Sequence, residues 1–456
     1  MKQLSLRNIA AASHGIYHGD GALLDREIAG VAIDSRKVEA DFLFVPIKGA
    51  RVDGHTFIPQ VMESGALCTL TEQPLSDVSF PWIQVPSTAD ALRDIAAFYR
   101  NSLDIKVVGI TGSVGKTSTK ETIASVLSQK YRVLKTEGNY NNEIGLPLTV
   151  FQIRPEHQVA VLEMGIDHFG EMHRLASVSQ PDICVITNIG LAHMENLGSR
   201  DGILKAKTEV FDHLKPDATV ILNGDDDKLC TVSLVQGKAP VFFGLDSSRD
   251  AWADGIENLG LRGTRCTLHL PAGDVRVHIP LPGEHMVYNA LAGACTGLAL
   301  GLSLEEIREG LATLRTIAGR SNLIDTGSLL IIDDCYNASP ASMKSSLDVL
   351  ATAEGRKVAV MGDMFELGPG ERELHYNTGV YAARKGIDVI CCIGCLSRST
   401  WEGARSQRTA DSGSVLYFET RDEFLDKMKN VIQKGDTVLV KASHGMEFSK
   451  IVETLQ

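Results

Sequence analysis

The sequence predicts an α/β protein of three domains: a small N-terminal α/β domain, a central P-loop domain with a doubly wound, mainly parallel sheet, and a C-terminal Rossmann-like domain. The length of 456 residues corresponds to about three ordinary domains. Short apolar segments alternate with helical segments, a pattern typical of a sheet covered by helices on both faces. A strand–loop–helix motif for phosphate binding begins near residue 107. We place the domains at residues 1–103, 104–316 and 317–456.

The bulk composition excludes several classes of protein. Hydrophobic residues make up 44% and charged residues 22%, as in globular proteins in water. No apolar run approaches the roughly 18 residues that span a bilayer, and no signal peptide is evident, so we expect a cytoplasmic protein without a membrane partner. A net charge of −12 provides no basic stripe for nucleic acid. Nine scattered cysteines, an odd number, fit a reducing compartment.

In the N-terminal domain, two short strands are each followed by polar loop residues. The strands are expected at residues 29–33 and 42–46, and a helix at residues 88–101 ends the domain. Polar residues in such loops often contact ligands, but Asp-Gly and Lys-Gly pairs also favour simple turns, and both interpretations stay open. The polar residues concerned are Ser35, Arg36, Lys48, Asp53 and His55.

The central domain opens with a glycine-containing loop between a β-branched strand and a helix that extends to about residue 130. Gly112 and Gly115 allow successive N–H groups to face an anion, and the helix N-terminus adds partial positive charge. Lys116 would then reach the outer phosphates and the Thr117 hydroxyl would hold Mg²⁺. Ile110 stands where the general P-loop has its first glycine, so the loop is a short form.

Later strands of the central domain end in polar residues, at the sheet edge where ligands bind. A strand at residues 159–163 ends in Glu163, which is placed as a Mg²⁺ ligand of a nucleotide enzyme would be. His193 follows the strand at residues 182–188, and we favour a ligand over an ordinary histidine there. Further elements are expected as a strand at 219–223, a hairpin at 264–270 and 275–279, and helices at 284–300 and 304–314.

The C-terminal domain again alternates strands and helices, but no G-x-G-x-x-G follows its first strand, so nothing indicates a dinucleotide. Cys392 and Cys395 form a C-x-x-C pair without a second pair nearby. We interpret them as ordinary cysteines, with a metal or redox role as the alternative. Strands are expected at residues 329–333, 357–361, 388–393, 415–418 and 437–441, and helices at 341–353, 372–385 and 422–434.

Together these motifs resemble the Mur ligase family of amide-forming ligases, from Asp34-Ser35-Arg36 through to Lys441-Ala442-Ser443, nearly the whole chain. The short P-loop has the family's form. The segments at residues 334–340 and 361–368 resemble the branch that adds D-alanyl-D-alanine to UDP-N-acetylmuramoyl-tripeptide. Asp-Asn-Pro-Arg, typical of the branch that adds the third amino acid, is absent. His444 stands where many relatives have arginine.

The resemblance implies ATP-dependent ligation through an acyl phosphate in cytoplasmic peptidoglycan precursor synthesis, by a monomer that uses ATP, two Mg²⁺ ions and a carbamylated lysine. It makes the N-terminal domain the one that binds the UDP-linked substrate. It also assigns catalytic roles to Lys116, His193 and Lys207. The implied ATP contacts are Gly112, Ser113, Val114, Gly115, Lys116, Thr117, Ser118, His285, Asn289, Arg320 and Asp334. The implied Mg²⁺ ligands are Thr117, Glu163, His193 and Lys207 as its carbamate. The implied substrate contacts are Ser35, Arg36, Lys48, Asp53, His55, Asn142, Tyr336 and Asn337.

Two kinds of protein are alternatives to a D-alanyl-D-alanine-adding ligase. The nearer is another amide ligase of the same superfamily, either folylpolyglutamate synthase or the ligase for the third amino acid. The more distant is a P-loop protein that is not a ligase, such as a regulatory NTPase or a kinase.

Overall fold

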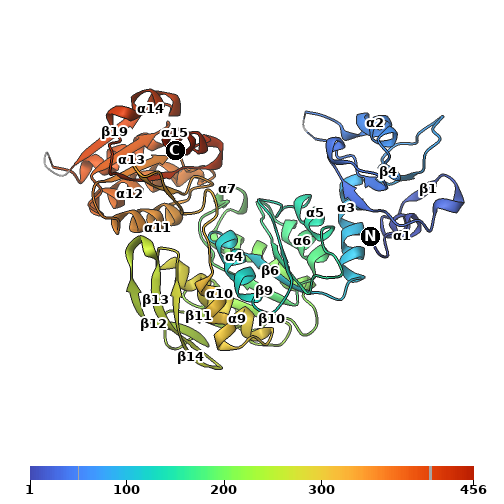
Figure 1. The fold of residues 1–456 in the computed structure, drawn as a ribbon, viewed down its shortest axis with the longest axis horizontal. Coiled ribbons are helices and arrows are strands. Elements are labelled where there is room, and N and C mark those ends of the chain that lie inside the picture. Colours follow the sequence, from blue (N-terminus) through green and yellow to red (C-terminus); the bar gives the residue numbers. More distant parts are fainter. Residues whose placement is uncertain (50, 410–412) are drawn as a thin grey trace. The chain divides into compact units, whose positions relative to one another are not determined.

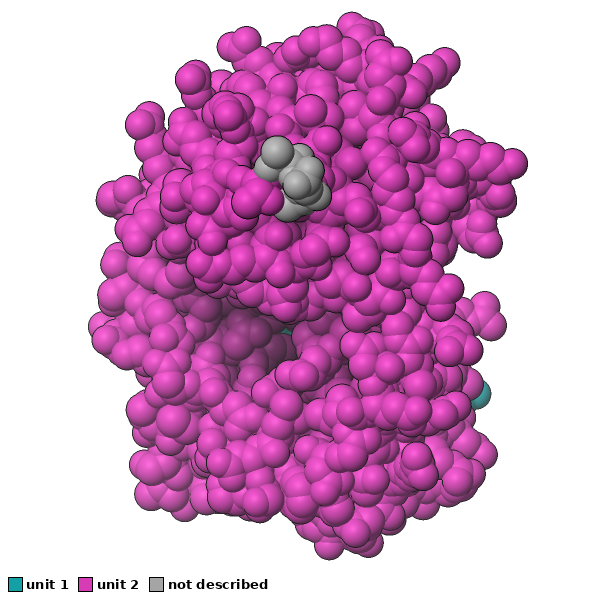
Figure 2. Space-filling model, turned by 90° about the vertical axis from the view of Figure 1, so that its left-hand side faces the viewer, with its two compact units in different colours: residues 1–110, 131–184, 208–218 teal, residues 111–130, 185–207, 219–456 magenta. Residues whose placement is uncertain are grey.

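The computed structural model describes residues 1–49, 51–409 and 413–456, which form two compact units (Figure 1). Unit 1 contains residues 1–110, 131–184 and 208–218, and unit 2 contains residues 111–130, 185–207 and 219–456. Figure 2 colours the two units and shows one face of unit 2, which is hollowed below its centre. No helix in the described ranges is long and apolar enough to cross a membrane. The three domain boundaries given above stay a prediction.

The N-terminal part of unit 1 is a five-stranded sheet of order β1-β5-β4-β3-β2. Strand β1 pairs antiparallel with β5, and the other neighbours are parallel. Helix α3 (Thr88–Asn101) has the predicted bounds, and both predicted strands are present. The remaining elements are α1 (Leu6–Ala12), β1 (Ile16–His18), β2 (Gly30–Ala32), β3 (Phe42–Phe44), α2 (Ile58–Glu63), β4 (Cys68–Thr71) and β5 (Trp82–Gln84).

The second part of unit 1 contains three parallel strands in the order β6-β8-β7. They are β6 (Lys106–Thr111, of which Thr111 belongs to unit 2), β7 (Val133–Lys135) and β8 (Val159–Glu163), with helices α5 (Gly145–Val150) and α6 (Glu171–Ser179). Strand β9 (Ile183–Ile186) follows α6 in the chain.

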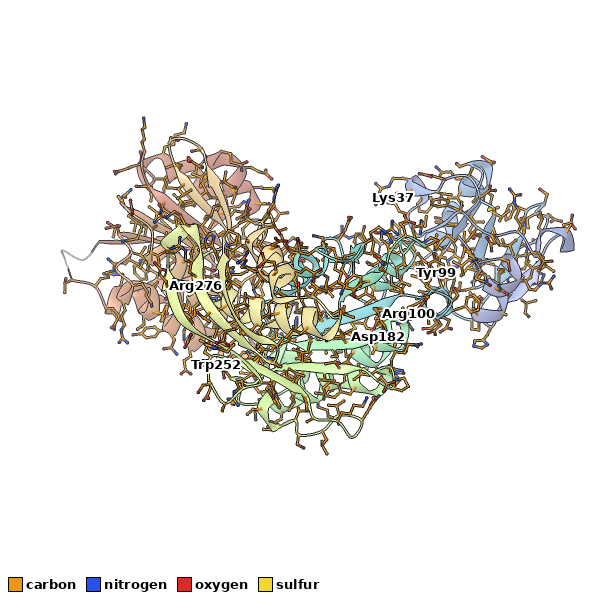
Figure 3. The ribbon with its side chains drawn as sticks, turned by 60° about the horizontal axis from the view of Figure 1, so that its bottom comes forward. Lys37, Tyr99, Arg100, Asp182, Trp252 and Arg276 are labelled. Carbon is orange, nitrogen blue, oxygen red and sulfur yellow. The ribbon has the colours of Figure 1, made fainter. Side chains whose placement is uncertain are left out.

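A buried arginine ties α3 to the end of α6. The Arg100 side chain donates to the Ser179 carbonyl over 2.9 Å and lies 3.2 Å from the Asp182 carboxylate (Figure 3). Burial lowers the pKa of Arg100, since desolvation disfavours its charged form. These contacts fix the α3 helix, which ends just before β6.

In unit 2, five strands follow one another in the order β14-β13-β12-β11-β10. Strands β10 to β12 are parallel, whereas β12 to β14 are antiparallel, which confirms the predicted hairpin. The sequence analysis did not predict β12, whose Trp252 (Figure 3) stacks on His269 at 3.8 Å. The bounds are β10 (Thr219–Asn223), β11 (Val241–Gly244), β12 (Ala251–Asn258), β13 (Thr264–Leu270) and β14 (Gly273–Ile279).

Helices α4 (Lys116–Leu127), α9 (His285–Ala299) and α10 (Leu304–Ala312) pack together in unit 2. Gly310 allows α10 to approach α4 closely, because a Cβ atom there would lie 2.5 Å from Val126 Cα. The short helices α7 (Met194–Leu197) and α8 (Arg200–Thr208, of which Thr208 belongs to unit 1) also belong to this unit.

The C-terminal part of unit 2 is a six-stranded sheet of order β15-β16-β20-β17-β18-β19. All five strands predicted for this part are present, and only β15 (Asn322–Asp325), not predicted, runs antiparallel to its neighbour. The others are β16 (Leu330–Asp333), β17 (Lys357–Gly362), β18 (Val389–Ile393), β19 (Ser414–Phe418) and β20 (Thr437–Lys441). The helices are α11 (Pro340–Ala351), α12 (Glu371–Arg384), α13 (Ser397–Ser406), α14 (Arg421–Lys427) and α15 (Ser449–Leu455).

This sheet has a hydrophobic core on each face. Ile331 belongs to one core and its neighbour Ile332 to the other, because successive side chains of a strand point to opposite faces. Because both faces of the sheet are buried, the sequences of these strands are nearly continuous runs of apolar residues. Cys392 is fully buried within β18, where burial raises the pKa of its thiol, whereas Cys395 is exposed just beyond the strand.

Candidate active site

The glycine-containing loop at residues 111–115 adopts a conformation that depends on its two glycines. Gly112 has φ +148°, and a Cβ atom there would lie 2.0 Å from Thr187 Oγ1. Gly115 has φ +85° and is the N-cap residue of α4. Residues with a side chain rarely adopt either backbone conformation, so both glycines are needed for the turn that starts the helix.

Asn188 braces this loop from the end of β9. The Ser113 N–H donates to the Asn188 carbonyl over 3.0 Å, and the Val114 N–H donates to Asn188 Oδ1 over 2.9 Å. The Asn188 amide donates in turn to the Val114 carbonyl over 2.8 Å. This role of Asn188 could not be predicted, since a position at the end of a strand does not by itself reveal a bond to another loop.

A lysine, Lys116, and a threonine, Thr117, are the first two residues of α4. Lys116 Nζ donates to the Gly112 carbonyl over 2.8 Å, which folds the lysine back over the loop. Thr117 is buried in the first turn of the helix. The positive end of α4 is suited to an anion, whereas the Ser113 and Val114 N–H groups of the loop are already bonded to Asn188.

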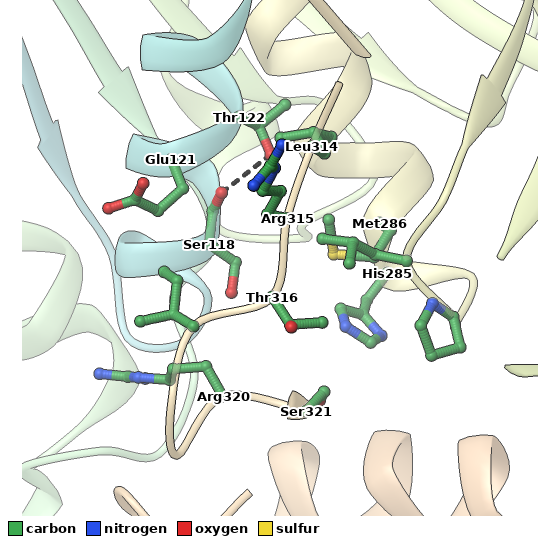
Figure 4. Close-up of a pocket in the computed structure, with 13 residues that line it drawn as sticks. Ser118, Glu121, Thr122, His285, Met286, Leu314, Arg315, Thr316, Arg320 and Ser321 are labelled. Atoms are coloured by element: carbon green, nitrogen blue, oxygen red, sulfur yellow. Dashed lines mark hydrogen bonds between the residues drawn. The ribbon is translucent and has the colours of Figure 1, made fainter. Parts of the chain in front are cut away.

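A pocket beside the loop is lined by residues of α4, of α9 and of the segment that follows α10 (Figure 4). Ser118, His285 and Arg320 line it, as expected if it holds a nucleotide. Burial lowers the pKa of His285, since desolvation disfavours the charged imidazolium. The remaining lining residues, to which the sequence analysis gave no role, include Glu121, Thr122, Met286, Arg315, Thr316 and Ser321.

Asn289 has a different position from the one its predicted ATP contact suggests. Its Oδ1 accepts a hydrogen bond from Thr119 Oγ1 over 2.8 Å in a buried site between α9 and α4. It is not among the residues that line the pocket, so its observed role is to join the two helices that do. A direct contact of Asn289 with ATP stays a prediction.

The loop after β16 is organised by a buried ion pair. Lys441 Nζ lies 2.6 Å from Asp334 Oδ2, and these side chains are 3% and 11% exposed. Lys441 also donates to the Asn337 carbonyl over 3.0 Å, while Asp334 accepts from the Ser321 N–H over 3.0 Å. Asp334 therefore holds three segments together, and any contact with ATP would be additional.

We expect Lys441→Met to destabilise the C-terminal sheet by about 3–5 kcal/mol, since it leaves the Asp334 carboxylate buried without its cation. Urea unfolding followed by circular dichroism measures the effect. The double variant Lys441→Met/Asp334→Asn should lose much less than the single variant. Equal losses in the two would show that the unpaired charge is not the cause.

Tyr336, in the same loop, contacts the side chains of Arg320 and His444. The Arg320 guanidinium stands over the Tyr336 ring at 3.9 Å from its centroid, and the His444 ring lies 5.5 Å away, centroid to centroid. A guanidinium on an aromatic face is held by the negative charge of the ring's π system. The stack fixes Arg320 at the edge of the pocket.

The residues proposed for Mg²⁺ come from both units, and each is described within its own unit. In unit 1, Glu163 is buried at the end of β8, and Asn141 Nδ2 donates to its Oε1 over 2.9 Å. In unit 2, Lys207 is buried on α8, and His193 Nδ1 lies 2.9 Å from Glu366 Oε2. Across the described residues, no group of three or more His, Cys, Asp or Glu side chains could hold a metal. The proposed set contains only two such residues, and its other donors would be a hydroxyl and a carbamate.

Asp34 and Asp53 stabilise the turns that carry most of the substrate residues predicted in unit 1. Asp34 pairs with Arg36 over 2.7 Å, which lowers the pKa of Asp34 to about 2, and the Arg36 side chain is 85% exposed. Asp53 accepts from the His55 backbone N–H over 3.0 Å and caps the turn there. These contacts agree with a turn role, and the choice between a turn role and a ligand role stays open. Contacts of Ser35, Arg36, Lys48, Asp53 and His55 with substrate stay predictions.

Asn142 likewise has a local structural role. Its Oδ1 accepts from the Gly145 N–H over 2.8 Å and from the Ile144 N–H over 3.2 Å, at the start of α5. An asparagine side chain that satisfies free N–H groups at a helix start is a common cap. Its predicted substrate contact also stays a prediction.

Three family models match consecutive parts of the chain. The model described as "Mur ligase family, catalytic domain" matches residues 27–100, "Mur ligase middle domain" matches residues 110–297, and "Mur ligase, glutamate ligase domain" matches residues 319–444. These matched ranges cover the motifs on which the resemblance was based.

Full-length relatives carry the name of one branch of that family. The UDP-N-acetylmuramoyl-tripeptide–D-alanyl-D-alanine ligase of Bacillus subtilis is 39% identical over 94% of this chain and 93% of its own. A crystal structure of MurF from Acinetobacter baumannii, 34% identical, has a TM-score of 0.92 and covers 99% of this chain and 98% of that one. MurF from Thermotoga maritima in complex with ADP, 28% identical, has a TM-score of 0.83 over 93% of this chain and 96% of that one. These structures confirm the predicted three-domain α/β fold. The chain therefore belongs to the Mur ligase family, in the group formed by the UDP-N-acetylmuramoyl-tripeptide–D-alanyl-D-alanine ligases.

Proposed function

We propose that this protein joins D-alanyl-D-alanine to UDP-N-acetylmuramoyl-tripeptide with consumption of ATP, in peptidoglycan precursor synthesis. The observation that carries the proposal is the 39% identity to a ligase of that name over nearly the full length of both chains. Because the matched ranges include residues 27–100, the similarity is not limited to a P-loop core that many NTPases share. We further propose that the enzyme acts as a monomer in the cytoplasm.

ATP binds at the glycine-containing loop and the pocket beside it. The N-terminus of α4 and Lys116 stabilise the phosphates, and Ser118, His285 and Arg320 contact the nucleotide from the pocket walls. The complex of a MurF relative with ADP supports this assignment. Arg320, held against Tyr336, brings a fixed cation to the phosphate end of the site.

The reaction proceeds in two steps. The terminal carboxylate of the tripeptide attacks the γ-phosphorus of ATP, which forms an acyl phosphate and releases ADP. The amine of D-alanyl-D-alanine then attacks the acyl carbon, and inorganic phosphate leaves as the amide forms. The protein has little covalent chemistry to perform: it aligns the groups, stabilises the negative charge and excludes water.

Mg²⁺, when bound, supplies positive charge that neutralises the transferring phosphoryl group. We propose that two ions are held by Thr117, Glu163, His193 and Lys207. The donor chemistry fits, since a hydroxyl, a carboxylate and an imidazole are all metal ligands. A carbamate on Lys207 would turn a buried cation into an anionic ligand. Tyr336 and Asn337 in the loop after β16, and the unit 1 residues described above, would contact the substrates.

A phosphate-release assay tests the proposed function. The enzyme should release phosphate from ATP only when both the UDP-linked tripeptide and D-alanyl-D-alanine are present, and mass spectrometry should detect the UDP-linked pentapeptide. The assay should include tripeptides that end in lysine and in diaminopimelate. Release from ATP alone would instead favour a regulatory NTPase, and release with another amino acid would favour a different ligase of the superfamily.

A further inference from the structure

A buried histidine holds the loop that follows β17. His375, on α12, is fully buried, and its Nε2 accepts a hydrogen bond from the Met364 N–H over 2.9 Å. Its Nδ1 lies 2.7 Å from the Glu371 carbonyl oxygen. A main-chain N–H only donates and a carbonyl only accepts, so Nδ1 carries the hydrogen and Nε2 the free lone pair. These two contacts therefore require a neutral imidazole in a single tautomer.

The surroundings of His375 also favour its neutral form. Burial lowers the pKa of the imidazole, because desolvation disfavours the imidazolium, and this effect outweighs the nearby Asp363 and Glu371 carboxylates. The imidazolium carries a hydrogen on both nitrogens, so it cannot accept from Met364. Protonation of His375 thus breaks the contact with Met364 and leaves a buried N–H without its acceptor.

The same loop is bonded to two further segments of unit 2. The Phe365 N–H donates to Ser443 Oγ over 2.9 Å, and the Ser443 N–H donates to the Asp363 carbonyl over 3.0 Å, just after β20. The Asp363 carboxylate accepts from the N–H of Ser397, the first residue of α13, over 2.7 Å. Three successive residues of the loop are therefore anchored, and His375 supplies the anchor that depends on protonation.

The anchored loop lies at the edge of the C-terminal sheet where ligands bind. Strands β16, β20 and β17 are adjacent and parallel, so the loops that follow them meet at their carboxyl ends. Tyr336, after β16, contacts His444, after β20. The Phe365 ring is 40% exposed and lies beside Gly445, whose Cβ atom, if present, would be 3.3 Å from it. Aromatic rings, one of them under the Arg320 guanidinium, suit a small ligand with apolar groups and a carboxylate.

We propose that His375 is a positioning residue that holds the loop after β17 in the conformation that binds D-alanyl-D-alanine. This inference rests on the proposed function, which supplies the dipeptide. ATP is assigned to the pocket beside α4 and the UDP-linked substrate to the N-terminal domain, so the dipeptide, with two methyl groups and a carboxylate, is left for this edge. His375 is too deeply buried to touch a substrate, and it acts through Met364 and Phe365.

Amide exchange measures the anchor itself. We expect His375→Ala to raise the hydrogen–deuterium exchange rate of the Met364 and Phe365 amides by about tenfold or more, since it removes an acceptor from a buried N–H. His375→Gln has a side-chain oxygen that can accept from Met364 and does not titrate, so it should restore most of the protection. His278→Gln changes an exposed histidine of β14 and is the matched control, with exchange unchanged.

Steady-state kinetics connect the anchor to the dipeptide. His375→Ala should raise KM for D-alanyl-D-alanine about tenfold while kcat and KM for ATP change by less than about twofold, because only one substrate loses its binding loop. In the wild type this KM should rise as the pH falls below about 6.5, the ordinary pKa of histidine. His375→Gln should lack this rise, and the ratio of the two KM values cancels the titration of the dipeptide itself.

The outcomes distinguish the two levels of the argument. If the wild type does not ligate D-alanyl-D-alanine, the proposed function is wrong and the dipeptide role of His375 falls with it. If the wild type does so but His375→Ala leaves amide exchange unchanged, or raises exchange without raising KM for the dipeptide, only the present proposal is overturned. If His375→Ala does not fold, the pH profiles decide: an equal rise of KM at acidic pH in wild type and His375→Gln overturns the proposal.

Discussion

Lys116→Ala should reduce the rate of acyl phosphate formation by about 10²–10³-fold or more, the loss typical when one group that stabilises transition-state charge is removed. Lys116 is the first residue of α4, and its ammonium group bonds to the Gly112 carbonyl of the same loop. No other residue of the loop carries a positive charge. The acyl phosphate can be trapped with hydroxylamine and measured as the hydroxamate.

The fold should survive this change, because alanine is a good helix former at the start of α4. Circular dichroism of the variant should match that of the wild type. Lys130→Ala is a suitable control: it removes a lysine just beyond the same helix, one that bonds to the Gly301 carbonyl, and should keep most of the activity. Near-normal turnover of Lys116→Ala would contradict the P-loop assignment.

Lys207→Ala should be inactive, with a loss of at least about 10²-fold, and formate or acetate should restore part of the rate. Lys207 is 1% exposed on α8, and a carbamate there would supply an anionic ligand that a small carboxylic acid can imitate. The rate of phosphate release is measured against the concentration of added acid. Lys205→Ala, which removes an exposed lysine of the same helix, should be nearly as active as the wild type and show no rescue.

A direct measurement complements the rescue experiment. If the carbon-13 spectrum of the active wild-type enzyme, kept in ¹³C-bicarbonate, shows no lysine carbamate signal, the carbamate proposal is wrong. Loss of activity in Lys207→Ala without rescue would leave the lysine important but would contradict the proposed carbamate.

Regular elements were predictable where local pattern and burial agree. Strand β8, strand β10 and helix α3 have the predicted bounds, since β-branched runs and a clear amphipathic helix specify them locally. Strand β12 was missed because its Asp254, Gly255 and Glu257 weaken the apolar pattern, and pairing with β13 compensates. The helix expected at residues 422–434 is shorter in the structure, where α14 ends at Lys427 and a 3₁₀ turn follows.

The candidate site was predictable only where a motif fixes its own geometry. The strand–loop–helix geometry around Gly112, Gly115 and Lys116 was predictable because local spacing determines such a loop, while its phosphate contacts stay a prediction. The bracing role of Asn188 was not predictable, because it depends on contacts with residues far away in the chain. The Lys441–Asp334 pair could not be predicted from local sequence for the same reason. The two residues are separated by more than one hundred positions, and only the fold brings them together.

The Asn188 contacts have a consequence for how the enzyme recognises ATP. When a phosphate loop becomes ordered only on binding its ligand, the entropy lost in that ordering offsets part of the favourable binding free energy. Here hydrogen bonds of the Asn188 side chain and main chain, just after β9, already fix the conformation of the loop. The loop therefore loses its conformational entropy during folding and not on binding. The site is thus preorganised, and more of the free energy of phosphate binding is available for affinity and for stabilising the transition state.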